Sequence, residues 1–325
     1  MKKLFVSMLV LTMMLCGCAS EETTKTKDLS EVKIGAIQLA QHPALDKAYE
    51  GFKDTLVKAG IKEEQIDFQN ASGDQSNCQT IAEKFVNDGD DLIYAIATDA
   101  LQAAANKTTT TPIIGAAVTN FEGTGVVKSN EKPETNVTGA SDMNPVKEQM
   151  DLLKKLVPNA KKIAIFYCSD EVNSIYQGEI AQKAAKEIGM DASIVTVSND
   201  SSAISQVAQS LIGKYDAVYI PTDNLLASNM ATVAQITNAN HLPCIVGEQS
   251  MCENGGLATL SLDYYTVGTK AGEQALAILK GEAKPEETPI SFIEGKDCKY
   301  FVNEKVAKQL GIEIPADLNA TVIGK

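Results

Sequence analysis

Arginine and tryptophan are absent from this sequence of 325 residues, so all 29 of its basic residues are lysine. Arginine is the side chain that grips a carboxylate, a phosphate or a sugar through paired hydrogen bonds. Without it, a ligand has to be held by backbone N–H groups, hydroxyls, amides or lysine. Aromatic residues are also scarce, at 5%, which argues against a site that stacks a sugar ring between aromatic side chains.

Metal ligands are few and poorly spaced for a metal site. There are only two histidines, His42 and His241, and no C-x-x-C pair, so we expect no zinc site and no cofactor. The cysteines beyond the N-terminal region are Cys78, Cys168, Cys244, Cys252 and Cys298. Their number is odd, and a disulfide between Cys252 and Cys298 is conceivable but has no support from the spacing.

The formal net charge is -13 at pH 7, and no basic cluster is present, which argues against nucleic acid and anionic lipid as partners. The sequence also contains no Gly-x-Ser-x-Gly elbow, P-loop or His-Glu metal motif. Neither histidine has an evident acid partner. An enzyme on an α/β fold therefore remains an alternative that no motif favours.

The first 17 residues have the pattern of a signal peptide. Two lysines precede an apolar stretch that is too short to span a bilayer. The stretch ends in Leu15-Cys16-Gly17-Cys18, which matches the lipobox of bacterial lipoproteins. We therefore expect lipidated Cys18 at the mature N-terminus, a flexible tether over 18–31, and a protein anchored outside the cytoplasmic membrane. An ordinary secretory signal is the alternative.

The remaining chain contains two copies of one α/β pattern. An apolar strand, a polar loop and an amphipathic helix occur over 32–59 and again over 161–190. Two further segments, 91–99 and 111–115, return in the same order at 216–223 and 242–247. Such a repeat at similar spacing indicates two structural units of the same kind.

Alternating strands and helices predict parallel sheets built from βαβ units. The expected strands of the first unit are 32–38, 65–69, 91–97 and 112–117, and its helices are 43–59, 75–88 and 99–107. Beyond it we expect a helix over 144–156, a strand at 257–262, a helix from Asp263 to Lys280, two short strands around 295–297 and a helix at 303–310. The fold class is thus α/β, with two Rossmann-like lobes joined by a hinge.

Ligands of such sheets bind beyond the carboxyl ends of the strands. In the first unit these ends, and the helix starts that follow, supply Gln41, His42, Leu45, Thr98, Ser141 and Asp142 as candidate ligand residues. In the second unit they supply Tyr167, Asn173, Ser174, Asp223, Asn224, Glu248 and Asp263. Free N–H groups at a helix start can hold a ligand carboxylate. Asp263 is either a helix N-cap or a ligand for an ammonium group, and the sequence leaves both open.

Several short motifs together resemble the ABC-transporter substrate-binding lipoproteins of the tryptophan/tyrosine type. The matching stretches, in order from about residue 33 to about residue 313, include His42-Pro43-Ala44-Leu45-Asp46, Asn70-Ala71-x-Gly73-Asp74, Ser141-Asp142, Glu171-x-Asn173-Ser174, Pro221-Thr222-Asp223-Asn224 and Asp263-Tyr264-Tyr265. One departure is Thr98-Asp99, where the family pattern leads us to expect Thr-Pro, so the role of Asp99 is open.

The resemblance implies a type I periplasmic-binding-protein fold that closes over a small solute and delivers it to an ABC permease and its ATPase. It implies lobe 1 from 32–142 plus about 263–282, lobe 2 from 143–262 plus about 283–325, and hinges near 140–144, 260–264 and 281–289. It further implies a monomer that binds an aromatic amino acid. Alternatives are a nucleoside or sugar in the same fold, or a sensor role instead of import.

Overall fold

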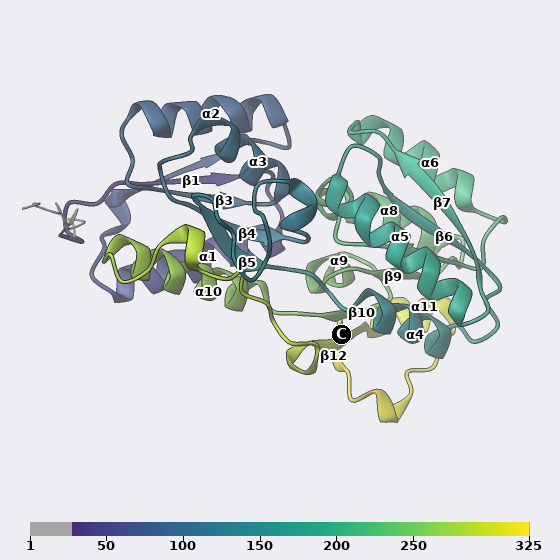
Figure 1. Cartoon of the computed structure of the whole chain (residues 1–325). Coiled ribbons are helices and arrows are strands. Elements are labelled where there is room, and N and C mark those ends of the chain that lie inside the picture. The colour runs from purple at the N-terminus through teal and green to yellow at the C-terminus, as the bar shows by residue number, and fades with distance from the viewer. Residues whose placement is uncertain (1–27, 325) are drawn as a thin grey trace, which may run out of the picture.

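The computed structural model describes residues 28–324 and consists of two α/β lobes side by side (Figure 1). The signal peptide, Cys18 and most of the tether lie outside the described residues. Within residues 28–324, no helix is long and apolar enough to cross a membrane.

Lobe 1 is built on a five-stranded parallel sheet in the order β2-β1-β3-β4-β5. The strands are β1 (Ile34–Gln38), β2 (Ile66–Asn70), β3 (Leu92–Ile96), β4 (Ile113–Val118) and β5 (Val137–Ser141). Four of them are buried along their whole length, as expected for a parallel sheet covered on both faces. Helices α1 (Pro43–Lys58) and α10 (Tyr264–Leu279) cover one face, and α2 (Gln75–Asn87) and α3 (Thr98–Lys107) cover the other (Figure 1).

Lobe 2 has a seven-stranded sheet in the order β12-β11-β10-β9-β8-β6-β7. Its strands are β6 (Lys162–Cys168), β7 (Asp191–Val197), β8 (Ala217–Ile220), β9 (Cys244–Val246), β10 (Ala258–Ser261), β11 (Lys299–Asn303) and β12 (Thr321–Ile323). All neighbours are parallel except β10 and β11. The five strands from β10 to β7 repeat the order of lobe 1, which confirms the predicted internal repeat.

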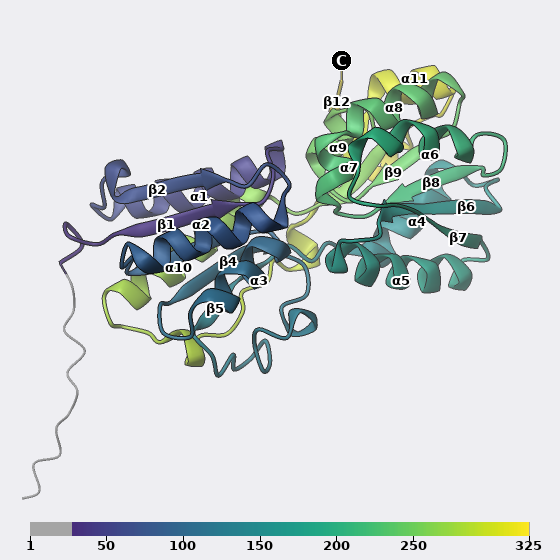
Figure 2. The same ribbon diagram turned by 90° about the horizontal axis from the view of Figure 1, so that it is seen from above.

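The helices of lobe 2 form a layer on each face of this sheet (Figure 2). Helices α4 (Val146–Leu156) and α5 (Val172–Glu187) cover one face, and α6 (Ile204–Leu211) and α8 (Met230–Ala239) cover the other. Three short helices complete the lobe: α7 (Asn224–Ser228), α9 (Gln249–Glu253) and α11 (Glu304–Leu310). Two of these, α7 and α9, begin where β8 and β9 end, so their N-termini lie at the carboxyl edge of the sheet.

The chain passes between the lobes three times, and the third passage differs from our expectation. After α10, the segment 286–291 stays with lobe 1, where Ser291 forms a bridge to Ala140 and the backbone N–H of Ile290 donates to Asn130. Ile290 is also part of the lobe 1 core. The third passage therefore comes after about residue 293, not at 281–289, because these residues extend the edge of the lobe 1 sheet.

Other differences lie in the C-terminal region. The segment around 295–297 is a short 3₁₀ helix, Gly295–Asp297, followed by β11, and the strand expected before it is reduced to the single bridge at Ser291. Strand β12 was not predicted. All five cysteines of the described chain are free, so Cys252 and Cys298 do not form a disulfide. The thiol of Cys252 instead lies within hydrogen-bonding distance of the Phe301 carbonyl.

Helix α10 returns to lobe 1 after the chain has built most of lobe 2, and glycines allow its close contact with α1. A Cβ atom on Gly268 would lie 2.0 Å from the carbonyl oxygen of Ala48, and one on Gly51 would lie 2.1 Å from that of Tyr265. The obstacles are backbone atoms, so a larger residue forces the helices apart. This contact binds the chain segment after lobe 2 firmly to lobe 1.

We therefore expect Gly268→Ala to lower the free energy of unfolding by about 1–3 kcal/mol or more, because overpacking strains the helix contact. Gly295→Ala is the matched control, since a Cβ there meets nothing within 4 Å. Urea denaturation of both variants measures the effect. Equal stability of the two variants would show that α1 and α10 do not pack as described.

Candidate functional site

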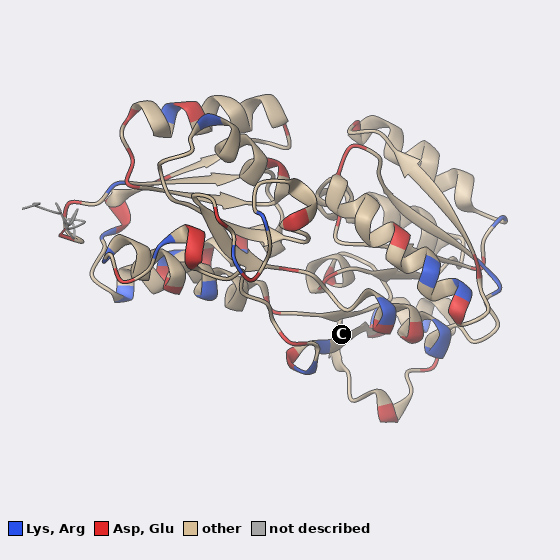
Figure 3. Ribbon diagram, in the orientation of Figure 1, with Lys and Arg blue, Asp and Glu red and all other residues tan. Residues whose placement is uncertain are grey.

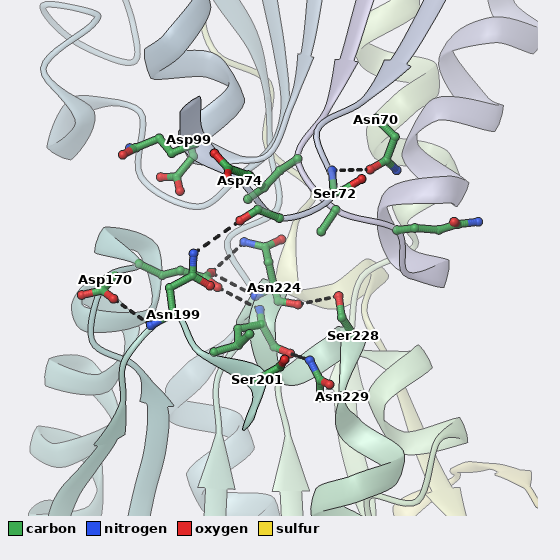
Figure 4. Close-up of a pocket in the computed structure, with 17 residues that line it drawn as sticks. Asn70, Ser72, Asp74, Asp99, Asp170, Asn199, Ser201, Asn224, Ser228 and Asn229 are labelled. Carbon is green, nitrogen blue, oxygen red and sulfur yellow. Dashed lines mark hydrogen bonds between the residues drawn. The ribbon is translucent and has the colours of Figure 1, made fainter. Parts of the chain in front are cut away.

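The carboxyl ends of the two sheets face each other across a cleft between the lobes. Its open part, which we call the outer cleft, has a volume of about 870 Å³ (Figure 4). Lobe 1 contributes Asn70, Ser72, Asp74 and Asp99, and lobe 2 contributes Asp170, Asn199, Ser201, Asn224, Ser228 and Asn229, among others. Its walls are mostly polar.

A second, nearly closed space of about 20 Å³, the central cavity, lies where both lobes and the hinge meet. Its lining residues are His42, Leu45, Ala117, Thr119, Asp142, Asn173, Thr222, Asp223, Asn224, Ala227, Glu248 and Tyr264. This volume holds about one water molecule. An amino acid fits only if the lobes separate or the side chains rearrange.

In lobe 2, carboxylates occupy the N-termini of two of the helices that face the cleft. Asp223 is the N-cap of α7 and accepts a hydrogen bond from Leu226 N–H at 2.8 Å. Glu171 also reaches this helix start, accepting from the backbone N–H groups of Asn224 and Leu225, each at 2.9 Å. At α9, Glu248 accepts from Ser250 N–H at 2.6 Å and from Met251 N–H at 2.8 Å. The free N–H groups and the positive dipole ends of α7 and α9 are therefore already paired with carboxylates of the protein.

In lobe 1, Asp74 caps α2, but the starts of α1 and α3 have no side-chain cap. The N-cap residues of α1 and α3 are His42 and Ala97, and neither makes a capping hydrogen bond. Non-glycine residues at the ends of β3 and β4 also have positive φ, 83° at Ala97 and 53° at Ala117, a strained geometry that tends to occur at functional sites. The helix starts of α1 and α3 in lobe 1 thus present free N–H groups, and carboxylates line the cleft from both lobes.

Negative charge dominates the cleft. Among the described residues that line the outer cleft and the central cavity there are seven carboxylates and no lysine. Red segments border the gap on both lobes in Figure 3. Because like charges repel in a partly buried space, the empty cleft favours a ligand that brings a positive group.

Burial changes the proton affinity of the cavity side chains. It raises the pKa of Asp142, although Tyr264 Oη and Thr119 Oγ1 donate to this carboxylate at 2.8 and 3.1 Å. It raises the pKa of Glu248 to about 7. Burial together with nearby Glu171 raises the pKa of Asp223 to about 8. A bound ammonium group would reverse these shifts, because it stabilises the charged form of each acid.

Three hydrogen bonds join the lobes directly across the cleft. His42 Nε2 lies 3.3 Å from Asn224 Oδ1, Gln177 donates to Thr119 Oγ1 at 3.5 Å, and Asn199 donates to the Gly73 carbonyl at 3.4 Å. They are long, so they contribute little to closure. Most of the stabilisation of a closed form must come from the ligand.

The structure brings most of the predicted site residues together. Those that line the central cavity are His42, Leu45, Asp142, Asn173, Asp223, Asn224 and Glu248. Gln41 lines the outer cleft, and Thr98 lines a side cavity of about 220 Å³ together with Asn173. Ser141 and Ser174 line no cavity but hydrogen-bond to residues that do. Ser141 donates to the Thr119 carbonyl, and Ser174 donates to the Asp223 carboxylate.

Two predicted residues lie elsewhere. The ring of Tyr167 packs in the core of lobe 2, where a Cβ on Gly178 would touch it. Asp263 is exposed and caps α10 through Tyr265 N–H, so the structure favours the N-cap alternative for this residue. The pattern of each element predicts where these residues lie along the chain but not the direction of their side chains, and neither side chain lines a cavity.

Several residues of the site were missing from the predicted set, among them Thr119, Thr222 and Glu171. Thr119 and Thr222 follow strands β4 and β8, so the rule that ligands meet strand ends could have found them. Glu171 lines the outer cleft from the N-cap of α5. Tyr264, which is a candidate wall residue for a flat ligand side chain from the sequence, lines the central cavity from the start of α10. Within residues 28–324, no group of three or more histidine, cysteine or acidic side chains is arranged to hold a metal ion.

Comparison with known proteins places this architecture in a family. Residues 33–322 match the family model described as ABC transporter substrate binding protein. A relative from Clostridioides difficile named tyrosine-binding protein is 40% identical over 310 residues, which is 92% of this chain and 89% of the relative.

Two solved structures are informative about conformation. A Streptococcus pneumoniae ABC domain in complex with L-Trp is 38% identical, with a TM-score of 0.86. A substrate-binding protein with adhesive properties from Clostridium difficile, in its ligand-free, open structure, is 40% identical, with a TM-score of 0.69. Each match covers 90% of this chain and 99% of the other. The two solved structures have similar identity to this chain and equal coverage, so we attribute the lower TM-score of the open structure to a different arrangement of its two lobes. The lobes of the present structure are therefore arranged as in the complex with L-Trp.

In this closed arrangement, Asp99 from lobe 1 and Glu171 from lobe 2 line the same outer cleft (Figure 4). Burial, with a contribution from Glu171, raises the pKa of Asp99 from 3.8 to about 6. Above pH 6 the ionised Asp99 therefore opposes closure. As the pH falls from 6 towards 3.8, protonation progressively removes this penalty.

We expect Asp99→Asn to favour the closed form of the ligand-free protein at pH 8 by about 1–3 kcal/mol. Small-angle scattering should give a smaller radius of gyration for the variant than for the wild type at pH 8, and a smaller difference between the two at pH 5. Comparing the two proteins at each pH cancels the titration of other acids. Asp151→Asn, at an exposed site on α4, is the control, and identical radii for wild type and Asp99→Asn at pH 8 would contradict the argument.

Proposed function

Since this chain belongs to the family of ABC transporter substrate-binding proteins, we propose that it captures an aromatic amino acid outside the cytoplasmic membrane and delivers it to an ABC permease and its ATPase. The family is one of extracytoplasmic binding proteins, not catalysts. The observation that carries the ligand assignment is that one cleft contains both uncapped helix starts, at α1 and α3, and buried carboxylates around the central cavity.

A free amino acid is a zwitterion, and each of its charges has a partner in the cleft. Its carboxylate would be bound by the uncapped starts of α1 and α3, which offer N–H groups and the positive end of a helix dipole. Its ammonium group would be bound by Asp142, Asp223 and Glu248 around the central cavity. No arginine is required on either side.

The relatives support an aromatic side chain. One is named for tyrosine and another holds L-Trp, and both are more than 35% identical to this chain over about nine tenths of its length. The apolar members of the central cavity, Leu45, Ala117, Ala227 and Tyr264, would form the walls against such a ring. A nucleoside or sugar ligand has no ammonium group to neutralise these carboxylates, and no observation favours it.

Ligand binding would hold the lobes together. A ligand that touches both lobes shifts the open and closed populations by its difference in affinity for the two forms. Neutralising the acidic cleft makes that difference large, because the closed empty cleft carries uncompensated charge. The protein would function as a monomer, since each lobe pair forms a complete site.

Binding can be tested on protein that has been denatured and refolded to remove any carried-over ligand. A thermal-shift screen of amino acids, nucleosides and common sugars should show stabilisation by tyrosine or tryptophan, about 2.7 kcal/mol at a concentration one hundred times Kd. Stabilisation by nucleosides or sugars alone would contradict the proposed ligand.

We expect Asp142→Asn to weaken binding of the amino acid about tenfold or more, because a hydrogen bond to a charged group contributes about 1.5–3 kcal/mol. Asp263→Asn is the control, since Asp263 is exposed and lines neither cavity. Calorimetric titration of the two variants checks this. An equal loss in both would place the ammonium site elsewhere.

Membrane attachment is proposed to depend on lipidation of Cys18. Cys18→Ala should move the protein from the membrane fraction to the medium or periplasm and abolish incorporation of labelled fatty acid. Cys16→Ala is the control, because it leaves a small residue within the lipobox and keeps Cys18. Retention of Cys18→Ala in the membrane would rule out the anchor.

A further inference from the structure

His42 has one ring nitrogen that the structure leaves without a partner. This residue precedes α1, is 7% exposed and lines the central cavity. Its Nε2 lies 3.3 Å from Asn224 Oδ1 on the opposite lobe. Its Nδ1 is buried and has no hydrogen-bond partner. A buried polar atom without a partner costs about 1–3 kcal/mol, so one that lines a binding cavity calls for an explanation, and a ligand group is one that would satisfy it.

The orientation of the Asn224 amide determines which proton His42 carries. Asn224 Nδ2 donates to Glu171 Oε2 at 2.7 Å, and the Asn224 backbone N–H donates to the same oxygen at 2.9 Å. Since Glu171 accepts from the amide nitrogen, the amide oxygen Oδ1 is directed to His42. An amide oxygen only accepts hydrogen bonds, so His42 Nε2 must carry a proton.

The imidazole is neutral under ordinary conditions. Burial lowers the pKa of His42 to about 4, well below neutral pH. A neutral imidazole with a proton on Nε2 has a bare lone pair on Nδ1. Glu171 and Asn224, on lobe 2, therefore fix a hydrogen-bond acceptor on lobe 1 when the lobes close.

We propose that His42 Nδ1 accepts a hydrogen bond from the ligand side chain, a phenol O–H or an indole N–H, and thereby selects against phenylalanine. This inference rests on the proposed function. The ammonium group has the charged acceptors Asp142, Asp223 and Glu248. His42 adds a neutral lone pair to the same cavity, whose apolar lining is Leu45, Ala117, Ala227 and Tyr264. That environment suits an aromatic side chain that carries a single donor. Phenylalanine would leave Nδ1 unpaired in the closed complex.

The first test compares ligands on the wild-type protein. Calorimetric titration should give a Kd for phenylalanine at least tenfold higher than that for tyrosine or tryptophan. Equal affinity for all three would overturn the selection by His42 but leave the proposed function intact. Failure of all three to bind would overturn both.

Two substitutions separate the ring nitrogens. His42→Gln can place an amide N–H near the position of Nε2 but offers no acceptor at that of Nδ1, whereas His42→Asn can place a carbonyl oxygen near the position of Nδ1. We expect the ratio of the phenylalanine Kd to the tyrosine Kd to fall towards one in His42→Gln and to be better preserved in His42→Asn. An unchanged ratio in His42→Gln would overturn the proposal.

A spectroscopic measurement on the wild-type protein covers the case in which the variants fail to fold. The chain has only two histidines, so long-range ¹H–¹⁵N spectra of the imidazoles are simple to assign. His42 should show a protonated Nε2 and a bare Nδ1, and the Nδ1 signal should move towards the hydrogen-bonded range with tyrosine but not with phenylalanine. A protonated Nδ1, or the same shift with both ligands, would overturn the proposal.

Discussion

The cleft depends on one constraint: buried carboxylates have to be stabilised in a protein without arginine. Helix N-termini solve this problem in lobe 2, where Asp223 and Glu171 share the start of α7 and Glu248 caps α9. Backbone N–H groups hold these acids in place but bring no formal positive charge. The acids consequently remain available to a ligand. Their pKa values are raised because the empty site has no positive group close to these buried carboxylates.

The same constraint connects recognition to movement. In the closed arrangement, Asp99 faces the acids of lobe 2 across the outer cleft, and the direct hydrogen bonds between the lobes are few and long. Closure without a ligand is therefore opposed by charge and weakly supported by contacts. On the proposed function, a zwitterion would supply an ammonium group to the acids and a carboxylate to the uncapped helices, and would thereby remove the obstacle and bridge the lobes. The binding energy and the change of conformation would then have the same source.

The fold provides the rigid frame on which this balance operates. Helix α10 is packed against α1 through Gly268 and Gly51, and the segment up to about residue 293 adds to the edge of the lobe 1 sheet. Each lobe is thus a well-packed unit, and the chain connects the two lobes through three short passages. Small changes at the cavity can in this way become a rotation of one whole lobe against the other.

The sequence by itself determined the fold class, the internal repeat and the strand ends at which Asp142, Asp223 and Glu248 lie, because these follow from local periodicity and from the geometry of parallel strands. Only the tertiary structure decided which side chains meet. Strand β6 is buried on both faces apart from its first residue, so its apolar pattern could not show that Tyr167 points into the core. An aspartate that precedes a helix looks the same in the sequence whether it caps the helix or binds a ligand. The sequence therefore could not decide between these two roles for Asp263. The pairing of His42 with Asn224 joins residues 182 positions apart, and no local pattern encodes a contact that forms only when two lobes close.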